Sequence, residues 1–126
     1  MINQNLPVLV VDDFKTTIRI VHSLLRQLGY ENLDEAANGE EALRKLETKD
    51  YGLVLSDWNM EPMTGLELLK RLRATAKGKR TPFVMITAET TTDNVTAARQ
   101  AGADGYIIKP FTAAVLKEKL SSIAAA

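Results

Sequence analysis

The chain has 126 residues, the length of one compact domain, and its 16 basic and 16 acidic residues give a formal net charge of zero. Because nucleic acids and membrane surfaces attract proteins with a basic excess, this balance argues against both as partners. The absence of cysteine excludes disulfide bonds, thiol catalysis and thiolate metal sites. The sequence has neither a signal-peptide pattern nor an apolar run of the ~20 residues that a membrane span needs, so we expect one cytoplasmic domain over residues 1–126.

Short apolar runs and helical patterns alternate along the chain, which predicts an α/β domain with parallel strands. Each apolar run that ends at a polar residue is typical of a strand buried on both faces. The expected strands are residues 7–11, 33–36, 53–56, 83–87 and 105–108. The expected helices are residues 15–28, 39–48, 64–74 and 92–101, followed by a last helix that begins at Thr112.

Capping patterns mark several of these boundaries. Asn38 with Glu41, and Thr64 with Glu67, have the spacing of an N-terminal capping pair. The other expected boundary residues are Gly29 and Gly102 after helices and Thr112 before one. Helical spacing predicts inward-facing side chains at Ile18, Val21, Leu25, Leu28, Val115, Leu116, Leu120 and Ile123. The segment 77–82 is expected to be a loop.

Four of the expected strands end at residues suited to phosphoryl chemistry. Asp12 and Asp13 follow the first strand, Asp57 follows the third, Thr87 ends the fourth and Lys109 follows the fifth. The carboxyl ends of parallel strands share one edge of the sheet, where open α/β sheets bind ligands. We therefore expect three carboxylates, a hydroxyl and an ammonium group in one crevice.

Each of these residues has a simpler interpretation when it is considered alone. Asp12 or Asp13 could cap the next helix, Asp57 and Lys109 could belong to turns, and Thr87 could be an ordinary strand end. Their joint placement favours a site. Clustered carboxylates repel one another by about 4 kcal/mol per pair at ~4 Å and an effective dielectric of ~20, so the cluster requires a proton or a cation. Oxygen ligands without histidine or cysteine favour Mg²⁺.

Magnesium beside a carboxylate and a lysine is typical of phosphoryl transfer. If the third, fourth and fifth strands are neighbours in that order, Thr87 lies one strand spacing of ~4.8 Å from Asp57, and Lys109 lies two spacings away. The short hydroxyl side chain of Thr87 suits the first distance, and the long side chain of Lys109 suits the second. Asp57 is the expected nucleophile, because a carboxylate can form an acyl phosphate. His22, on the first helix among apolar neighbours, is expected to be a structural or surface residue and not a ligand.

Four segments also match the motifs of a known family. They are Val-Val-Asp12-Asp13-Phe14, Ser56-Asp57-Trp58-Asn59-Met60, Thr87-Ala88-Glu89 and residues 105–112, and they resemble the receiver domains of two-component response regulators, in particular CheY-like single-domain regulators. The resemblance implies a flavodoxin-like, doubly wound five-stranded parallel sheet with the order 2-1-3-4-5. It also implies a chemotaxis signalling protein that catalyses only its own phosphorylation and dephosphorylation.

The resemblance implies a role for each site residue. Asp57 accepts a phosphoryl group from a histidine kinase. Mg²⁺ is held by Asp13, Asp57 and the backbone carbonyl of Asn59, with Asp12 acting through water. Lys109 pairs first with the acceptor and then with a phosphoryl oxygen.

Further residues are implied in switching and hydrolysis. Thr87 and the Ala88 amide bind another phosphoryl oxygen, and Tyr106 turns inward when Thr87 moves. Asn59 and Glu89 flank the site and modulate hydrolysis. The output surface is the fourth helix, the fifth strand and the fifth helix. The implied partners of the expected monomer are a CheA-like histidine kinase, a flagellar motor switch protein and a phosphatase.

The chain departs from the family pattern at two places. Glu61 follows Met60 where the family usually has proline, which here stands at position 62. Residues 90–92 are threonines where motor-binding relatives commonly have lysines. A phosphate sink without a motor partner therefore stays open as an alternative output.

Other classes of protein fit the sequence less well. A haloacid-dehalogenase-like phosphatase, which also uses an aspartyl phosphate, needs Asp-x-Asp after the first strand, and Asp12-Asp13-Phe14 lacks it. A flavodoxin-like flavin binder needs a phosphate-cradling loop there, where two aspartates would repel the phosphate. No Gly-Lys-Ser/Thr loop of a P-loop nucleotidase is present. A pseudo-receiver that only binds partners is disfavoured by the complete set of site residues.

Overall fold

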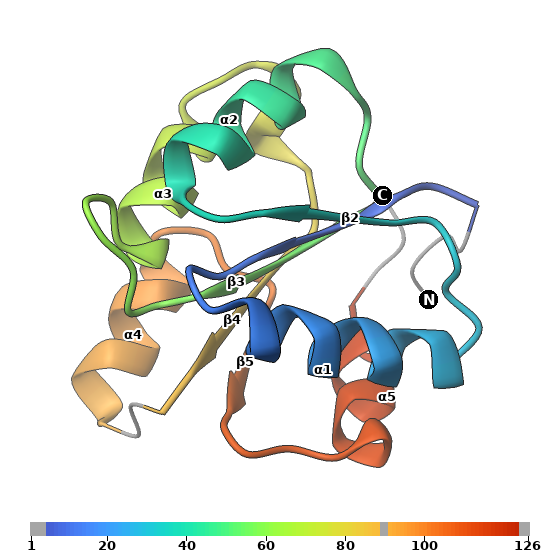
Figure 1. Ribbon diagram of the computed structural model, residues 1–126. Coiled ribbons are helices and arrows are strands. Elements are labelled where there is room, and N and C mark those ends of the chain that lie inside the picture. Colours follow the sequence, from blue (N-terminus) through green and yellow to red (C-terminus); the bar gives the residue numbers. More distant parts are fainter. Residues whose placement is uncertain (1–4, 89–90, 124–126) are drawn as a thin grey trace.

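The computed structural model describes residues 5–88 and 91–123, which form a flavodoxin-like α/β fold (Figure 1). Five parallel strands form one sheet with the order β2-β1-β3-β4-β5, as the family resemblance implies. The strands are β1 (Val8–Val11), β2 (Leu33–Ala36), β3 (Leu53–Asp57), β4 (Phe83–Thr87) and β5 (Gly105–Ile108). The helices are α1 (Lys15–Gln27), α2 (Gly39–Thr48), α3 (Gly65–Arg73), α4 (Thr92–Gln100) and α5 (Ala113–Ser121), with a short 3₁₀ turn η1 (Lys77–Lys79).

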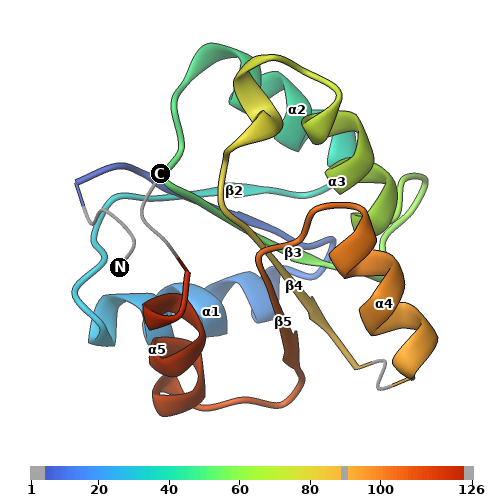
Figure 2. The ribbon, with the colours of Figure 1, turned by 180° about the vertical axis from the view of Figure 1, so that it is seen from behind.

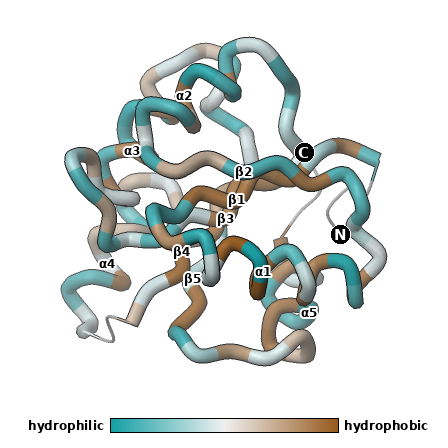
Figure 3. Tube along the Cα trace, in the orientation of Figure 1, coloured by the Kyte–Doolittle hydropathy of each residue, from teal (hydrophilic) through white to brown (hydrophobic). Residues whose placement is uncertain are grey.

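Helices cover both faces of the sheet. α1 and α5 lie on one face, and α2, α3 and α4 lie on the other (Figures 1 and 2). The apolar colour of the tube is concentrated in the central strands, between the two helical layers (Figure 3). All residues of β1, β3 and β4 are buried, because a parallel sheet between two helical layers has no solvent-exposed face. The core thus fixes the central strands whose carboxyl ends carry the expected site.

The predicted capping pairs are confirmed. The Asn38 side chain accepts a hydrogen bond from the Glu41 amide at 2.8 Å, and Thr64 accepts one from the Glu67 amide at 3.2 Å. Such caps satisfy amides that have no partner inside the helix. Gly29 follows the C-terminal end of α1. It has a φ of 96°, a left-handed conformation that glycine adopts without a steric penalty.

The structure differs from the sequence-based expectation in three local details. Residues 77–79 form the turn η1 inside the expected loop, and β3 extends by one residue so that Asp57 is its last residue. Val115, expected to face inward, is 39% exposed. The buried residues of α5 are Leu116 and Leu120, and Val115 lies about 100° from Leu116 and about 140° from Leu120 around the helix.

A side chain without an expected role ties the loops at the amino ends of the strands together. The Arg73 guanidinium donates to the carbonyls of Gly78 at 2.7 Å, Thr81 at 2.6 Å and Gly102 at 2.8 Å, and it pairs with Asp104 at 3.1 Å. Burial lowers the pKa of Arg73, an effect that the nearby Asp104 opposes. Arg73 therefore joins the end of α3 to the segments that precede β4 and β5.

Within the described part of the chain, none of the helices combines the length and the apolar character required to span a membrane.

Tyr30 provides a test of the core energetics. Its side chain is 2% exposed, and its hydroxyl has no hydrogen-bond partner among the described residues. Since a buried unpaired hydroxyl loses its hydration without compensation, Tyr30→Phe should raise the free energy of unfolding by about 1 kcal/mol. Urea unfolding measures the change. Tyr51→Phe is the matched control: the Tyr51 hydroxyl donates to Asp34 at 2.6 Å, so its removal should destabilise the protein.

Candidate functional site

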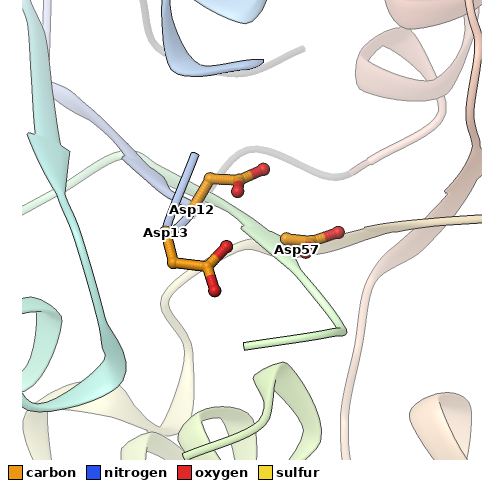
Figure 4. Close-up of side chains that lie close together, drawn as sticks. All are labelled: Asp12, Asp13 and Asp57. Carbon is orange, nitrogen blue, oxygen red and sulfur yellow. The ribbon is translucent and has the colours of Figure 1, made fainter. Parts of the chain in front are cut away.

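The expected polar residues lie together at the carboxyl edge of the sheet. Figure 4 shows the carboxylates of Asp12, Asp13 and Asp57 gathered around the ends of β1 and β3. One oxygen from each lies within 4.8 Å of the others, so the three could hold a metal ion. Asp12 and Asp57 are buried, whereas Asp13 is exposed. The cluster is therefore closed on the side of the core and open toward solvent.

The strand order brings Lys109 to this cluster. The Lys109 Nζ atom lies 2.8 Å from Asp57 Oδ1 and 3.6 Å from Asp12 Oδ2. The Lys109 amide donates to the Thr87 carbonyl at 2.9 Å, and the Trp58 amide donates to the Ile86 carbonyl at 3.1 Å. The hydrogen-bond ladders thus continue past the ends of β3 and β5, which fixes the backbone next to Asp57 and at Lys109.

Asp12 does not cap α1. The cap position belongs to Phe14, whose side chain makes no capping hydrogen bond. Asp12 Oδ1 instead accepts a hydrogen bond from the Phe14 amide at 2.9 Å. Burial raises the pKa of Asp12, and the negative charges of Asp57 and Asp13 add to this effect, while the Phe14 amide and Lys109 oppose it. The simpler capping interpretation of this residue is therefore wrong.

Glycine at position 65 allows the end of β3 to lie close to α3. A Cβ atom there would come within 2.2 Å of the Asp57 carbonyl oxygen. The Gly65 amide also donates to the Trp58 carbonyl at 2.9 Å. Any larger side chain would displace the end of β3 and with it the Asp57 carboxylate. Sequence analysis missed this role, because only the three-dimensional approach of α3 to β3 reveals it.

The loop after β3 forms the outer wall of the site. A hollow beside the cluster is lined by Asp13, Asn59, Met60, Glu61, Pro62 and Thr64. Asn59 and Glu61 are both exposed, so they extend the polar rim of the cluster. The Glu61–Pro62 and Lys109–Pro110 peptide bonds are cis. Pro62, the displaced proline, is one of the residues that line the hollow.

The expected switch residues Thr87 and Tyr106 lie on β4 and β5, and Ala88 directly follows β4. Thr87 is completely buried, and Ala88 is exposed. The half-buried Tyr106 ring packs edge-to-face against Trp58, with 6.4 Å between ring centroids. This contact was not predicted, although the position of Trp58 directly after Asp57 was visible in the sequence. Glu89, expected to modulate hydrolysis, lies outside the described residues.

The single histidine lies away from this edge. The His22 Nε2 atom is 3.2 Å from the backbone carbonyl oxygen of Asp34 on β2, and the side chain is buried. This position agrees with the expected structural role.

Comparisons with known proteins agree with the fold. The sequence model of the response regulator receiver domain matches residues 8–121. The chain is 50% identical over 123 residues to chemotaxis protein CheY-3 of Vibrio cholerae, covering 98% of this chain and 95% of that protein. It is 47% identical over 116 residues to chemotaxis protein CheY of Pseudomonas aeruginosa, covering 92% and 94%.

Solved structures give the same assignment. The chemotaxis protein CheY4 of Vibrio cholerae superposes with a TM-score of 0.87 at 35% identity, covering 94% of this chain and 98% of that chain. The receiver domain of a sensor histidine kinase from Pseudomonas aeruginosa, solved with a magnesium ion coordinated in its active-site cleft, gives 0.82 at 29% identity, covering 92% and 94%. The chain belongs to the response regulator receiver domain family. It is a CheY-like two-component signalling domain with chemotaxis proteins among its relatives.

Neutralising Asp12 should stabilise the metal-free protein. In Asp12→Asn, the side-chain oxygen of the new asparagine can still accept a hydrogen bond from the backbone N–H of Phe14. The substitution removes the desolvated charge of Asp12 and its repulsion with Asp57 and Asp13. We expect a gain of about 1 kcal/mol in the free energy of unfolding at neutral pH in EDTA, measured with urea. Glu118→Gln, an exposed change on α5, should stay within about 0.5 kcal/mol. A clear loss of stability in Asp12→Asn would show that its attraction to Lys109 outweighs the repulsion.

Proposed function

We propose that this protein is a cytoplasmic response regulator of chemotaxis signalling that accepts a phosphoryl group on Asp57. The observation that carries the proposal is the position of the Asp57 carboxylate, at the end of a buried strand between the Lys109 ammonium group and two further aspartates. The names of its curated relatives support the chemotaxis assignment. The donor is a histidine kinase of the CheA-like type.

The transfer forms one bond and breaks another. A carboxylate oxygen of Asp57 attacks the phosphorus of a phosphohistidine, an acyl phosphate forms, and the P–N bond breaks with its electron pair going to the leaving imidazole. Lys109 already contacts Asp57, and it follows the charge to a phosphoryl oxygen as the bond forms. Thr87 and the Ala88 amide bind another phosphoryl oxygen.

The acidic residues fit a hard divalent cation such as Mg²⁺. Carboxylate and carbonyl oxygens are its preferred ligands, and the desolvated, mutually repelling carboxylates lack sufficient positive charge from Lys109 alone. Asp13, Asp57 and the Asn59 carbonyl would hold the ion, with Asp12 acting through water. When bound, it would neutralise charge on the transferring phosphoryl group. A magnesium-containing cleft in a related receiver domain supports this assignment.

The output is a change of the surface formed by α4, β5 and α5. An acyl phosphate adds a charge of roughly −1.5 to −2 if it resembles other phosphorylated residues. Moving Thr87 toward it vacates space into which Tyr106 turns. Shifting the ratio of switched to unswitched conformation from 1:99 to 99:1 takes about 5.5 kcal/mol of differential binding free energy. A few charge-assisted hydrogen bonds of about 1.5–3 kcal/mol each can supply it. Exposed Ile108 and Val115 give this surface an apolar component for a partner such as a motor switch protein or a phosphatase.

The acceptor can be tested by direct labelling. With acetyl phosphate and Mg²⁺, the protein should gain one phosphoryl group in its mass spectrum, and Asp57→Asn should gain none. Asp13→Asn, or omission of Mg²⁺, should slow labelling strongly, because the negative charge on the phosphoryl group in transfer is then no longer neutralised. Asp93→Asn, an exposed change on α4, is the matched control and should label normally. Equal labelling of Asp57→Asn would place the acceptor elsewhere.

The switch can be separated from the chemistry with Thr87→Ala. This variant should still accept a phosphoryl group on Asp57, because it retains the nucleophile, the acidic cluster and Lys109. Amide-resolved NMR with beryllofluoride as the phosphoryl mimic should show large shifts in α4, β5 and α5 of the unaltered protein and much smaller ones in the variant. If the surface around Tyr106 shifts equally in both proteins, the coupling does not pass through Thr87.

A further inference from the structure

A second cavity lies at the opposite edge of the sheet. It occupies about 330 Å³ between α2 and the segment that joins α3 to β4. These two segments lie side by side in both ribbon views (Figures 1 and 2). Its apolar walls are formed by Leu43, Leu46, Tyr51, Leu72 and Pro82. The volume and apolar walls are those of a small-molecule site rather than of a packing defect.

The end of α3 and the segment that follows it carry a concentrated positive charge. Residues 70–80 contain six basic residues and no acidic residue, whereas the whole chain is neutral. Two of the six are engaged, Arg73 by Asp104 and Lys77 by Asp50. The other four are exposed and form no ion pair with the described residues: Lys70, Arg71, Lys79 and Arg80. Of these, Arg80 lines the cavity directly.

The opposite wall carries less uncompensated charge. Two acidic residues line it, Glu47 and Asp50. Lys77 reaches across from η1 and lies 3.2 Å from the Asp50 carboxylate, while its Nζ atom also donates to the Glu47 carbonyl at 3.3 Å. Both side chains of the Lys77–Asp50 pair are largely exposed, so the pair contributes little stability and can open. Of the two acidic side chains on this wall, Glu47 is the one that forms no ion pair with the described residues.

We propose that this cavity binds a small organic anion, with its apolar body against Leu46, Leu72 and Pro82 and its carboxylate or phosphate group at Arg80. Apolar walls favour a flat or branched hydrocarbon body, and a guanidinium at the mouth favours a planar oxyanion that it can contact with two N–H groups. The unpaired cations nearby attract the same charge over a longer range.

Binding of the proposed ligand is independent of the phosphorylation chemistry at the acidic cluster. Tyr51 and Pro82 precede β3 and β4, whereas the acidic cluster lies at the carboxyl ends of β1 and β3. The five residues of β3 separate the two places by about 16 Å. A ligand in the cavity and Mg²⁺ at the acidic cluster should therefore bind without competition.

The test is an amide-resolved NMR titration of the full chain with 2-naphthoate, with 2-naphthyl phosphate as a second anion and neutral 2-naphthalenemethanol as the matched probe. Both anions should shift residues 43–51 and 72–82, and they should bind about fivefold more tightly than the alcohol. The anion that binds with the higher affinity shows whether the site prefers a carboxylate or a phosphate group. Mg²⁺ should leave these affinities unchanged.

Two variants and a control make the result decisive. Arg80→Ala should abolish the preference for the anions, and Leu43→Trp, which fills the cavity from a half-buried position, should weaken all three probes. Arg19→Ala, an exposed change on α1, should alter nothing. Equal affinity for anion and alcohol, an unchanged preference in Arg80→Ala, shifts located elsewhere, or no saturable shift up to the solubility limit would each overturn the proposal.

Discussion

The attraction between Lys109 and the Asp57 carboxylate is the interaction on which the acidic site depends. Three aspartates with oxygens within 4.8 Å of one another cannot all remain charged beside a hydrophobic core without a compensating cation. The Lys109 ammonium group supplies part of that compensation through its contacts with Asp57 at 2.8 Å and Asp12 at 3.6 Å. One ammonium group cannot balance three carboxylates, so the cluster still requires a proton or a further cation. Oxygen ligands of this kind would suit a hard cation.

The strand order makes this attraction possible. Asp57 and Lys109 are 52 residues apart, and they meet because β3, β4 and β5 are neighbours with their carboxyl ends on one edge. Thr87 lies between them on β4, so a short hydroxyl and a long ammonium side chain reach the same region. A register shift of one residue would turn each side chain to the other face of the sheet. The buried apolar residues of β3 and β4 oppose such a shift, so the hydrophobic core also determines the geometry of the charged groups.

Local patterns predicted the strands, the caps and the gathering of the acidic residues, because each depends on a few neighbouring side chains and on the parallel arrangement. The same reasoning failed for Val115, since an apolar residue one position from a buried leucine does not share its helix face. It missed Arg73 because four contacts with distant loops leave no periodic signal in the sequence. It missed the Trp58–Tyr106 contact for the same reason, and no local pattern indicates that Gly65 lies against the Asp57 carbonyl.

The two edges of the sheet place different mechanical constraints on α4. At its C-terminal end, Arg73 holds the Gly102 carbonyl and Asp104, which precede β5. At its N-terminal end, the helix follows the segment that begins with Thr87 and Ala88, next to the acidic cluster. A helix anchored at one end responds to a displacement at the other by rotating about the anchored end rather than by moving as a whole. In the proposed switch, a small movement of Thr87 therefore becomes largest at the N-terminal end of α4 and least where Arg73 holds it.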